Sequence, residues 1–283
     1  MPRVYRVRRI GRRVFLADLG RGTVAAAVFG VGLVACSGDD PDALPASTAT
    51  AVSPSPAVTQ APTATAAATA AASPTAAVTA AAPAAGALPA GWARVALGGV
   101  SAYVLLRDGE AAIVDTGVAG SAGEIEAGLT ALGAGWDAVG HVIVTHSHRD
   151  HQGSLADVLA AAADATAYAG AGDLAAITSP RALVAVADGG RVFDLEIIET
   201  PGHTPGHISV LDSAAGLLVA GDALNGAAGD VAGPNARFSS DHAAAIRSVT
   251  KLAGFEFAAA VFGHGDPVIG GASARVAALA ATL

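Results

Sequence analysis

The chain has 283 residues, 52% of them hydrophobic and 14% charged, which is enough apolar chain for one sizeable globular core. Its charge is unevenly divided. Seven of the 16 Lys and Arg residues lie before residue 22, whereas from Gly91 onward 9 basic residues face 20 acidic ones, a net charge of −11. A domain this acidic repels phosphate backbones, which argues against a nucleic-acid partner.

The first 36 residues have the layout of a bacterial export signal. An arginine-rich start leads into the apolar run 22–35, which is too short to cross a bilayer comfortably. Residues 12–16 resemble a twin-arginine signal, and residues 33–36 (Leu-Val-Ala-Cys) resemble a lipobox, in which cleavage frees the cysteine for lipidation. We therefore expect a signal peptide over residues 1–36, with Cys36 as a lipid tether to the outer face of the cell membrane. The alternative is an uncleaved amphipathic anchor.

Residues 37–90 consist largely of Ala, Thr, Pro and Ser, with almost no large apolar side chain. Such a segment buries too little surface to offset the entropy of ordering, and its prolines interrupt any helix. We expect a disordered stalk, which separates the membrane anchor from a single globular domain over residues 91–283.

Within that domain, short apolar runs alternate with stretches of helical spacing, and this alternation predicts an α/β fold. The turn Asp108-Gly109 joins the first two runs in the manner of a hairpin, and Ser239 or Ser240 is expected to cap the third helix. The predicted strands are 101–106, 111–114, 141–145, 191–199, 207–212, 217–220 and 258–262, and the predicted helices are 124–132, 155–163, 241–252 and 273–281.

Four potential metal ligands fall within six residues, directly after a predicted strand and before a helix: His146, His148, Asp150 and His151. The first two point the same way if the extended backbone continues, and the other two come round on the following turn. Two adjacent metal ions are therefore predicted. A solvated loop whose histidines cap the helix is the alternative, and it is disfavoured because His203, Asp222 and His264 follow later strands, each beside a glycine.

This pattern resembles the metallo-β-lactamase superfamily, whose His-x-His-x-Asp-His motif, followed by separate His, Asp and His residues, is matched at every position. The resemblance covers essentially residues 91–283. It implies an αββα sandwich of two mixed sheets with helices outside and two metals at one edge. By the resemblance, one metal is held by His146, His148 and His203 and the other by Asp150, His151 and His264, while Asp222 bridges them.

Two further residues belong to the predicted site. Asp115, in Val114-Asp115-Thr116-Gly117, resembles the first motif of the superfamily, in which a carboxylate orients metal ligands. For His207 two roles stay open, a contact with substrate and the capping of a strand. The remaining histidines of the domain, His141 and His242, are expected to be structural.

The expected function is hydrolysis of a small molecule. Imidazole and carboxylate ligands suit zinc, with iron or manganese as alternatives, and a water shared by two such ions loses a proton near neutral pH. The resulting hydroxide would cleave an ester, lactone, amide or related bond. Asp222 would bridge the ions, and Asp150 or water would handle the proton of the leaving group.

Two other classes of function stay open. One is oxygen or persulfide chemistry at iron, although flavodiiron proteins carry Glu where this chain has His148, and a single iron would not need Asp150, His151 and His264. The other is a non-catalytic metal-binding envelope protein. Among hydrolases, a glyoxalase-II-like thioesterase is less expected, because those enzymes normally add a C-terminal helical region and this chain stops at Leu283.

Overall fold

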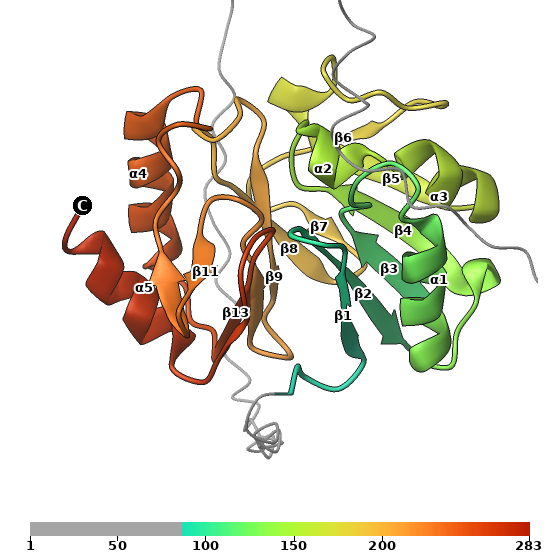
Figure 1. Cartoon of the computed structure of the whole chain (residues 1–283), viewed down its shortest axis with the longest axis horizontal. Helices are drawn as coiled ribbons and strands as arrows, with labels where there is room; N and C mark the ends of the chain where they lie inside the picture. Colours follow the sequence, from blue (N-terminus) through green and yellow to red (C-terminus); the bar gives the residue numbers. More distant parts are fainter. Residues whose placement is uncertain (1–86) are drawn as a thin grey trace, which may run out of the picture. The chain divides into compact units, whose positions relative to one another are not determined.

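The computed structural model describes residues 87–283 (Figure 1). The predicted signal peptide, the tether Cys36 and almost all of the predicted stalk lie outside these residues and stay predictions. Among residues 87–283, no helix combines the length and the apolar character needed to cross a membrane.

The first sheet has six strands in the order of the sequence. Its first three strands are antiparallel, and the strands from β3 to β6 are parallel. Helices α1 and α3 lie on its outer face (Figure 1). The elements are β1 (Trp92–Ala96), β2 (Ser101–Arg107), β3 (Glu110–Val114), α1 (Ala122–Ala131), β4 (Val139–Val144), α2 (Arg149–Gln152), α3 (Leu155–Ala161), β5 (Thr166–Gly170) and β6 (Val184–Val186).

The second sheet also has six strands, in the order β14-β13-β10-β9-β8-β7, and is mixed because β10 and β13 run parallel. A separate hairpin of β11 and β12 lies beside it. The elements are β7 (Arg191–Val192), β8 (Leu195–Glu199), β9 (Ile208–Asp212), β10 (Leu217–Val219), β11 (Asn225–Ala227), β12 (Asp230–Ala232), α4 (His242–Leu252), β13 (Ala259–Val261), β14 (Val268–Ile269) and α5 (Ala272–Ala280).

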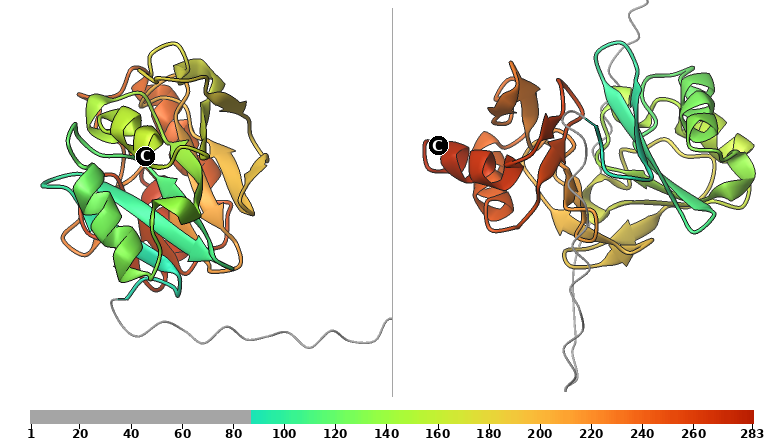
Figure 2. Two further views of the ribbon diagram at one scale, coloured as in Figure 1. Left: turned by 90° about the vertical axis from the view of Figure 1, so that its right-hand side faces the viewer. Right: turned by 90° about the horizontal axis from the view of Figure 1, so that it is seen from below.

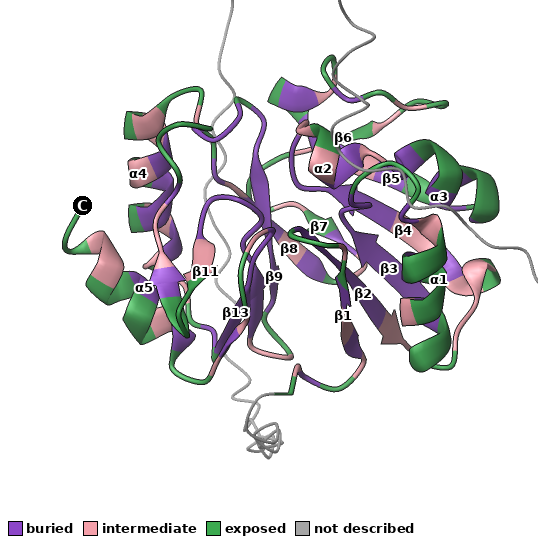
Figure 3. Ribbon diagram, viewed as in Figure 1, coloured by how far each residue is buried: buried purple, intermediate pink, exposed green. Residues whose placement is uncertain are grey.

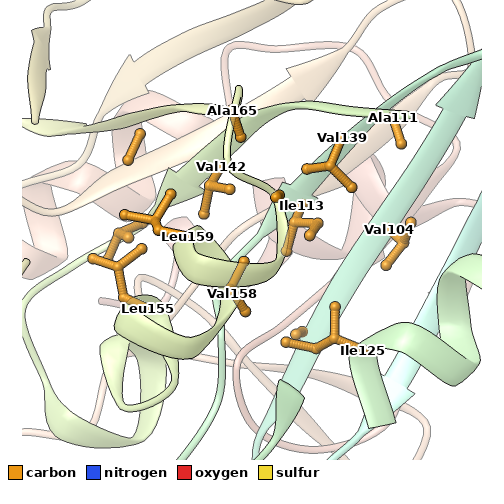
Figure 4. Packing of buried hydrophobic residues seen from close by; sticks show 14 of the residues in the cluster. Val104, Ala111, Ile113, Ile125, Val139, Val142, Leu155, Val158, Leu159 and Ala165 are labelled. Atoms are coloured by element: carbon orange, nitrogen blue, oxygen red, sulfur yellow. The ribbon is translucent and has the colours of Figure 1, made fainter. Parts of the chain in front are cut away.

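The alternation of side chains along the strands produces four layers. In β3, Ala111 and Ile113 face α1 and α3 (Figure 4), whereas Ala112 and Val114 face the second sheet. The inner layer packs Tyr103, Leu105 and Ile143 of the first sheet against apolar residues of β8, β9, β10 and β13. The opposite face of the second sheet is covered by α4 and α5. The αββα sandwich implied by the resemblance is thus confirmed (Figures 2 and 3).

Two sequence predictions were wrong in detail. Residues 191–199 form two antiparallel strands, not one, because Phe193 and Asp194 adopt left-handed backbone conformations and close a two-residue hairpin turn. The cap of α4 is Asp241, whose carboxylate accepts the N–H of Ala244 at 2.9 Å. The side chains of the two predicted caps, Ser239 and Ser240, bond instead to the carbonyls of Asn235 and Gly202.

Candidate metal centre

The polar residues of the site follow strands that end at one edge of the sandwich. In the first sheet, Asp115 follows β3 and the run 146–151 begins two residues after β4. In the second sheet, β8 and β10 both run antiparallel to β9, and β13 runs parallel to β10. The loops that follow β8, β10 and β13 carry His203, Asp222 and His264, respectively. Because the strands point the same way, the structure brings all seven predicted ligands together.

Three of them, all histidines, form a first group. The Nδ1 atom of His148 lies 3.1 Å from Nε2 of His146 and 2.9 Å from Nε2 of His203. The potential ligand atoms of the three residues all lie within 4.8 Å of one another, a spacing that could hold a metal ion. Both His146 and His203 are buried.

A second group lies beside the first and combines Asp150, His151 and His264. The Oδ2 atom of Asp150 is 3.3 Å from Nε2 of His264 and 3.9 Å from Nε2 of His151. Here too the ligand atoms lie within 4.8 Å of one another. His151 is fully buried, whereas the other two side chains are about 40% exposed and face the solvent side of the site.

The carboxylate of Asp222 lies between the two groups. Its Oδ2 atom is 3.3 Å from His203 Nε2 and 3.4 Å from His264 Nε2, and its Oδ1 atom is 3.4 Å from His151 Nε2. Room for it depends on Gly263, since a Cβ at that position would lie 2.1 Å from Asp222 Oδ1. Asp222 is therefore placed to contact ions in both groups.

The hydrogen bonds around three imidazoles orient their lone pairs toward the centre. His264 Nδ1–H donates to the carbonyl of Gly99 at 2.7 Å, and His151 Nδ1–H donates to Asp115 Oδ2 at 2.8 Å. The hydroxyl of Thr145 donates to Asp115, so its oxygen accepts the Nδ1–H of His146. In the unprotonated ring, each Nε2 atom then presents a lone pair inward. Converging lone pairs beside carboxylate oxygens fit divalent cations.

Asp115 has the geometry of the orienting residue that the resemblance implies. Its carboxylate is buried and accepts the N–H and hydroxyl of Thr145 as well as the Nδ1–H of His151. Its backbone is in the left-handed region, with φ of 62°, which turns the chain sharply at the end of β3. One carboxylate thus fixes His151 directly and His146 through Thr145.

His207 is buried and holds the backbone of Asp222. Its Nε2 atom accepts the Asp222 N–H at 3.0 Å, and its Nδ1–H donates to Thr200 Oγ1 at 2.8 Å. Burial lowers the pKa of His207 to about 3, so the ring is neutral, as an acceptor Nε2 requires. Both ring nitrogens of His207 therefore form hydrogen bonds with groups inside the protein, and neither faces the open side of the site.

The other two histidines of the domain lie away from the described metal groups. His141, in β4, stacks on Phe193 with ring centres 5.1 Å apart and approaches Glu110 to 3.1 Å. His242 is the first residue of α4.

Asp173 is part of the site's framework and was missed by the sequence analysis. It is buried three residues after the end of β5, and its Oδ2 atom accepts the N–H of Ser147 at 2.8 Å and the hydroxyl of Thr204 at 2.6 Å. Its Oδ1 atom accepts the N–H of Gly206 at 2.7 Å. One carboxylate therefore joins the loop of His146 and His148 to the loop of His203.

The protonation of the site differs between the two groups. Burial lowers the pKa of His146 well below its ordinary value and that of His203 to about 4. Burial also disfavours the charged form of His151, but Asp115 and Asp222 raise its pKa to about 10. Hydrogen bonds to Asp150 and Asp222 raise the pKa of His264 to about 11. Both carboxylates keep low pKa values. The hydrogen bond from His264 lowers the pKa of Asp150, and hydrogen bonds from His151 and His264 lower the pKa of Asp222 despite its burial.

A cleft of about 490 Å³ opens over the two groups. Its lining includes five of the predicted ligands, together with Arg149, Asn225, Asn235 and Phe238. The amides of the two asparagines supply polar atoms near the ligands, and Phe238, 59% exposed, supplies an aromatic wall. A cleft of this size can take a small organic molecule.

The sequence model of the metallo-beta-lactamase superfamily matches residues 95–264, which include every ligand named above. The chain belongs to this superfamily. It is 44% identical over 84 residues to the Probable metallo-hydrolase YflN of Bacillus subtilis (strain 168), over 26% of this chain and 32% of that one. It is 37% identical over 94 residues to the hydroxyacylglutathione hydrolase of Pseudomonas fluorescens (strain SBW25), over 32% of this chain and 34% of that one.

Members of the superfamily are metallo-hydrolases, and hydroxyacylglutathione hydrolase is one of them. The matches cover only about a third of the length of these two curated relatives. Among solved structures, the metallo-beta-lactamase SMB-1 in a complex with mercaptoacetic acid has a TM-score of 0.56 at 20% identity, over 69% of this chain and 92% of that one. At that identity the similarity establishes the fold alone.

Proposed function

We propose that this protein is a binuclear metal-dependent hydrolase of small molecules, which cleaves an ester, lactone, thioester or amide bond. The observation that carries the proposal is the position of Asp222 between two three-ligand groups that consist only of histidine and aspartate side chains, with no serine, threonine or cysteine among them. Zinc is the metal that this donor set favours, and iron and manganese are the alternatives to be tested.

When bound, two divalent ions would supply hydroxide from a shared water near neutral pH and would polarise the carbonyl oxygen of the group that is cleaved. The residues of this chain would hold those ions and position the substrate. His146, His148 and His203 would hold one ion, Asp150, His151 and His264 the other, and Asp222 both. Asn225 and Asn235 line the cleft and can donate hydrogen bonds to a substrate carbonyl.

Asp150 is a weak candidate for donating a proton to the leaving group. Its pKa is lowered by the hydrogen bond from His264, so the carboxylate stays ionised near neutral pH. We therefore expect Asp150 to act as a ligand and hydrogen-bond acceptor, and the leaving group to be protonated by water.

We also propose that the protein acts outside the cytoplasm as a lipoprotein, on the strength of the export motifs before residue 37.

Metal content and chelation test the proposed function. The purified protein is expected to bind about two metal ions per chain and to hydrolyse at least one reporter among esters, lactones, thioesters and amides. A chelator should abolish this activity, and added metal should restore it. Zinc, manganese and iron are supplied separately, and oxygen uptake is followed in the iron arm. Folded protein that binds no metal when metal is offered would contradict the proposal.

Proton release on metal binding is the second prediction. In the metal-free protein at pH 7, His151 and His264 carry protons because their pKa values lie near 10 and 11, whereas His146 and His203 are neutral. A metal ligand must be unprotonated, so the group with His151 and His264 should release about two protons per chain and weaken as the pH falls. Calorimetric zinc titrations in buffers of different ionisation enthalpy measure this. A zinc-binding enthalpy that is the same in every buffer would refute this prediction.

A further inference from the structure

A second cleft of about 540 Å³ adjoins the one over the metal groups. The two clefts share Arg149 and Asp150, which lie at the start of α2, so these residues form the boundary between them. Apart from these two, the polar side chains of the second cleft belong to Gln152 and Thr178. The amide of Gln152 is already bonded to the carbonyls of Ser147 and Ala176 and to the N–H of Thr178.

Arg149 is the only lysine or arginine among the residues that line these two clefts. Within residues 87–283, no carboxylate oxygen lies within 4.0 Å of its guanidinium, and it makes no side-chain hydrogen bond, although four other cations of the domain have acidic partners. A guanidinium carries five N–H donors in a planar fork that matches a carboxylate. Arg149 therefore offers a cation and its donors to whatever occupies the boundary.

The charge of the metal-loaded site also favours an anionic occupant. Its seven ligands include only two carboxylates, those of Asp150 and Asp222, so two divalent ions leave an excess of positive charge. Arg149 adds to that excess, whereas the domain from Gly91 onward has a net charge of −11. With both ions bound, the clefts would form a local positive region on an acidic domain, and such a region concentrates anions.

Apolar side chains flank this positive boundary. Among the described residues, four large hydrophobic side chains are exposed, and two of them line the clefts: Phe238 in the first and Val118, 43% exposed, in the second. Exposed apolar groups beside convergent polar groups are typical of binding sites for organic ligands. The occupant that fits carries both an anionic group and an apolar part.

We propose that Arg149 is a specificity-determining residue, which selects substrates that carry a carboxylate a few bonds away from the cleaved acyl bond and an apolar part against Phe238. This inference rests on the proposed hydrolase function. The carboxylate would accept hydrogen bonds from Arg149 at the boundary of the two clefts, while the acyl group lies over the metal ligands.

A matched pair of esters tests this inference on the zinc-loaded full chain. Mono-4-nitrophenyl glutarate and 4-nitrophenyl pentanoate have the same acyl length and leaving group, and differ by a terminal carboxylate in place of a methyl group. We expect kcat/KM to favour the anionic ester about tenfold or more, mainly through KM. Arg149→Gln should remove this preference. Arg191→Gln, at the exposed position of β7, should retain it and controls for loss of a positive charge.

The outcomes separate the inference from the function on which it rests. A preference for the anionic ester that persists in Arg149→Gln, or its absence in the unmodified protein, would overturn the inference while leaving the hydrolase intact. If neither ester is cleaved, calorimetric binding of 4-phenylbutyrate and 4-phenylbutanamide to the zinc-loaded protein decides the inference alone: equal binding overturns it, and tighter anion binding that Arg149→Gln abolishes supports it. If Arg149→Gln slows only bis(4-nitrophenyl) phosphate, the selected anion is a phosphodiester, and the carboxylate assignment is wrong.

Discussion

Replacing Asp222 by alanine is expected to reduce hydrolysis by about 10³-fold, the largest effect of any single substitution in the site. The carboxylate lies within 3.4 Å of His151, His203 and His264, so it is placed to bind ions in both groups and to hold them at a fixed separation. Losing that contact removes several kcal/mol of transition-state stabilisation, and each 1.36 kcal/mol corresponds to a tenfold change in rate. Steady-state kinetics on whichever reporter the unmodified protein cleaves best gives the ratio.

The same variant should lose bound metal. The Asp222 carboxylate approaches imidazole nitrogens of both groups, so each metal ion would lose an anionic ligand. Metal analysis after dialysis is expected to show fewer than two ions per chain. Asp164→Ala, in the exposed turn after α3, is the matched control and should behave as the unmodified protein. An Asp222→Ala protein that keeps its full activity would exclude a catalytic role for this carboxylate.

The ligands of the site could be predicted from the sequence because their signal is local. Four of them fall within 146–151, and the other three lie beside glycines that have a steric reason to be there. At Gly263 a Cβ would collide with Asp222, and at Gly221, with φ of 57°, it would lie 2.7 Å from His207 Nε2. The layers of the fold followed from the resemblance and from the alternation of apolar residues in strands such as β2 and β3.

The features that were missed depend on contacts between distant segments. The hairpin at 191–199 has an apolar pattern that continues through its turn, and Phe193-Asp194 lacks the Asn-Gly or Asp-Gly signal of such turns. Asp173, in Gly170-Ala171-Gly172-Asp173, is indistinguishable from an ordinary turn aspartate. Its three donors lie 26 to 33 residues away along the chain. Ser147 meets it through the pairing of β4 with β5, whereas Thr204 and Gly206 meet it only when the two sheets pack. Its place after β5, the parallel neighbour of β4, was the one usable signal.

Asp173→Asn is expected to weaken metal binding by the first histidine group about 10- to 100-fold, because residues that orient metal ligands contribute affinities of that size. Either orientation of an asparagine amide points its NH₂ group at an N–H donor, that of Gly206 on one side or that of Ser147 on the other. At least one hydrogen bond between the two metal-bearing loops is then lost, and a buried donor left unpaired costs about 1–3 kcal/mol. His148 and His203, whose nitrogens now lie 2.9 Å apart, would lose their common anchor.

Competition with a chromophoric chelator measures this affinity, and the absorption spectrum of the cobalt-substituted protein reports the geometry of the first group. Thr204→Val removes only one of the three hydrogen bonds and should give a smaller loss. Asp241→Asn is the matched control, because at the start of α4 the carboxylate accepts a single N–H and an amide oxygen can replace it. If Asp173→Asn instead lowers the affinity of both groups equally together with the melting temperature, Asp173 stabilises the fold as a whole. A loss confined to the first group, with the cobalt spectrum altered and the second group unchanged, identifies it as the residue that positions the His146, His148 and His203 side chains.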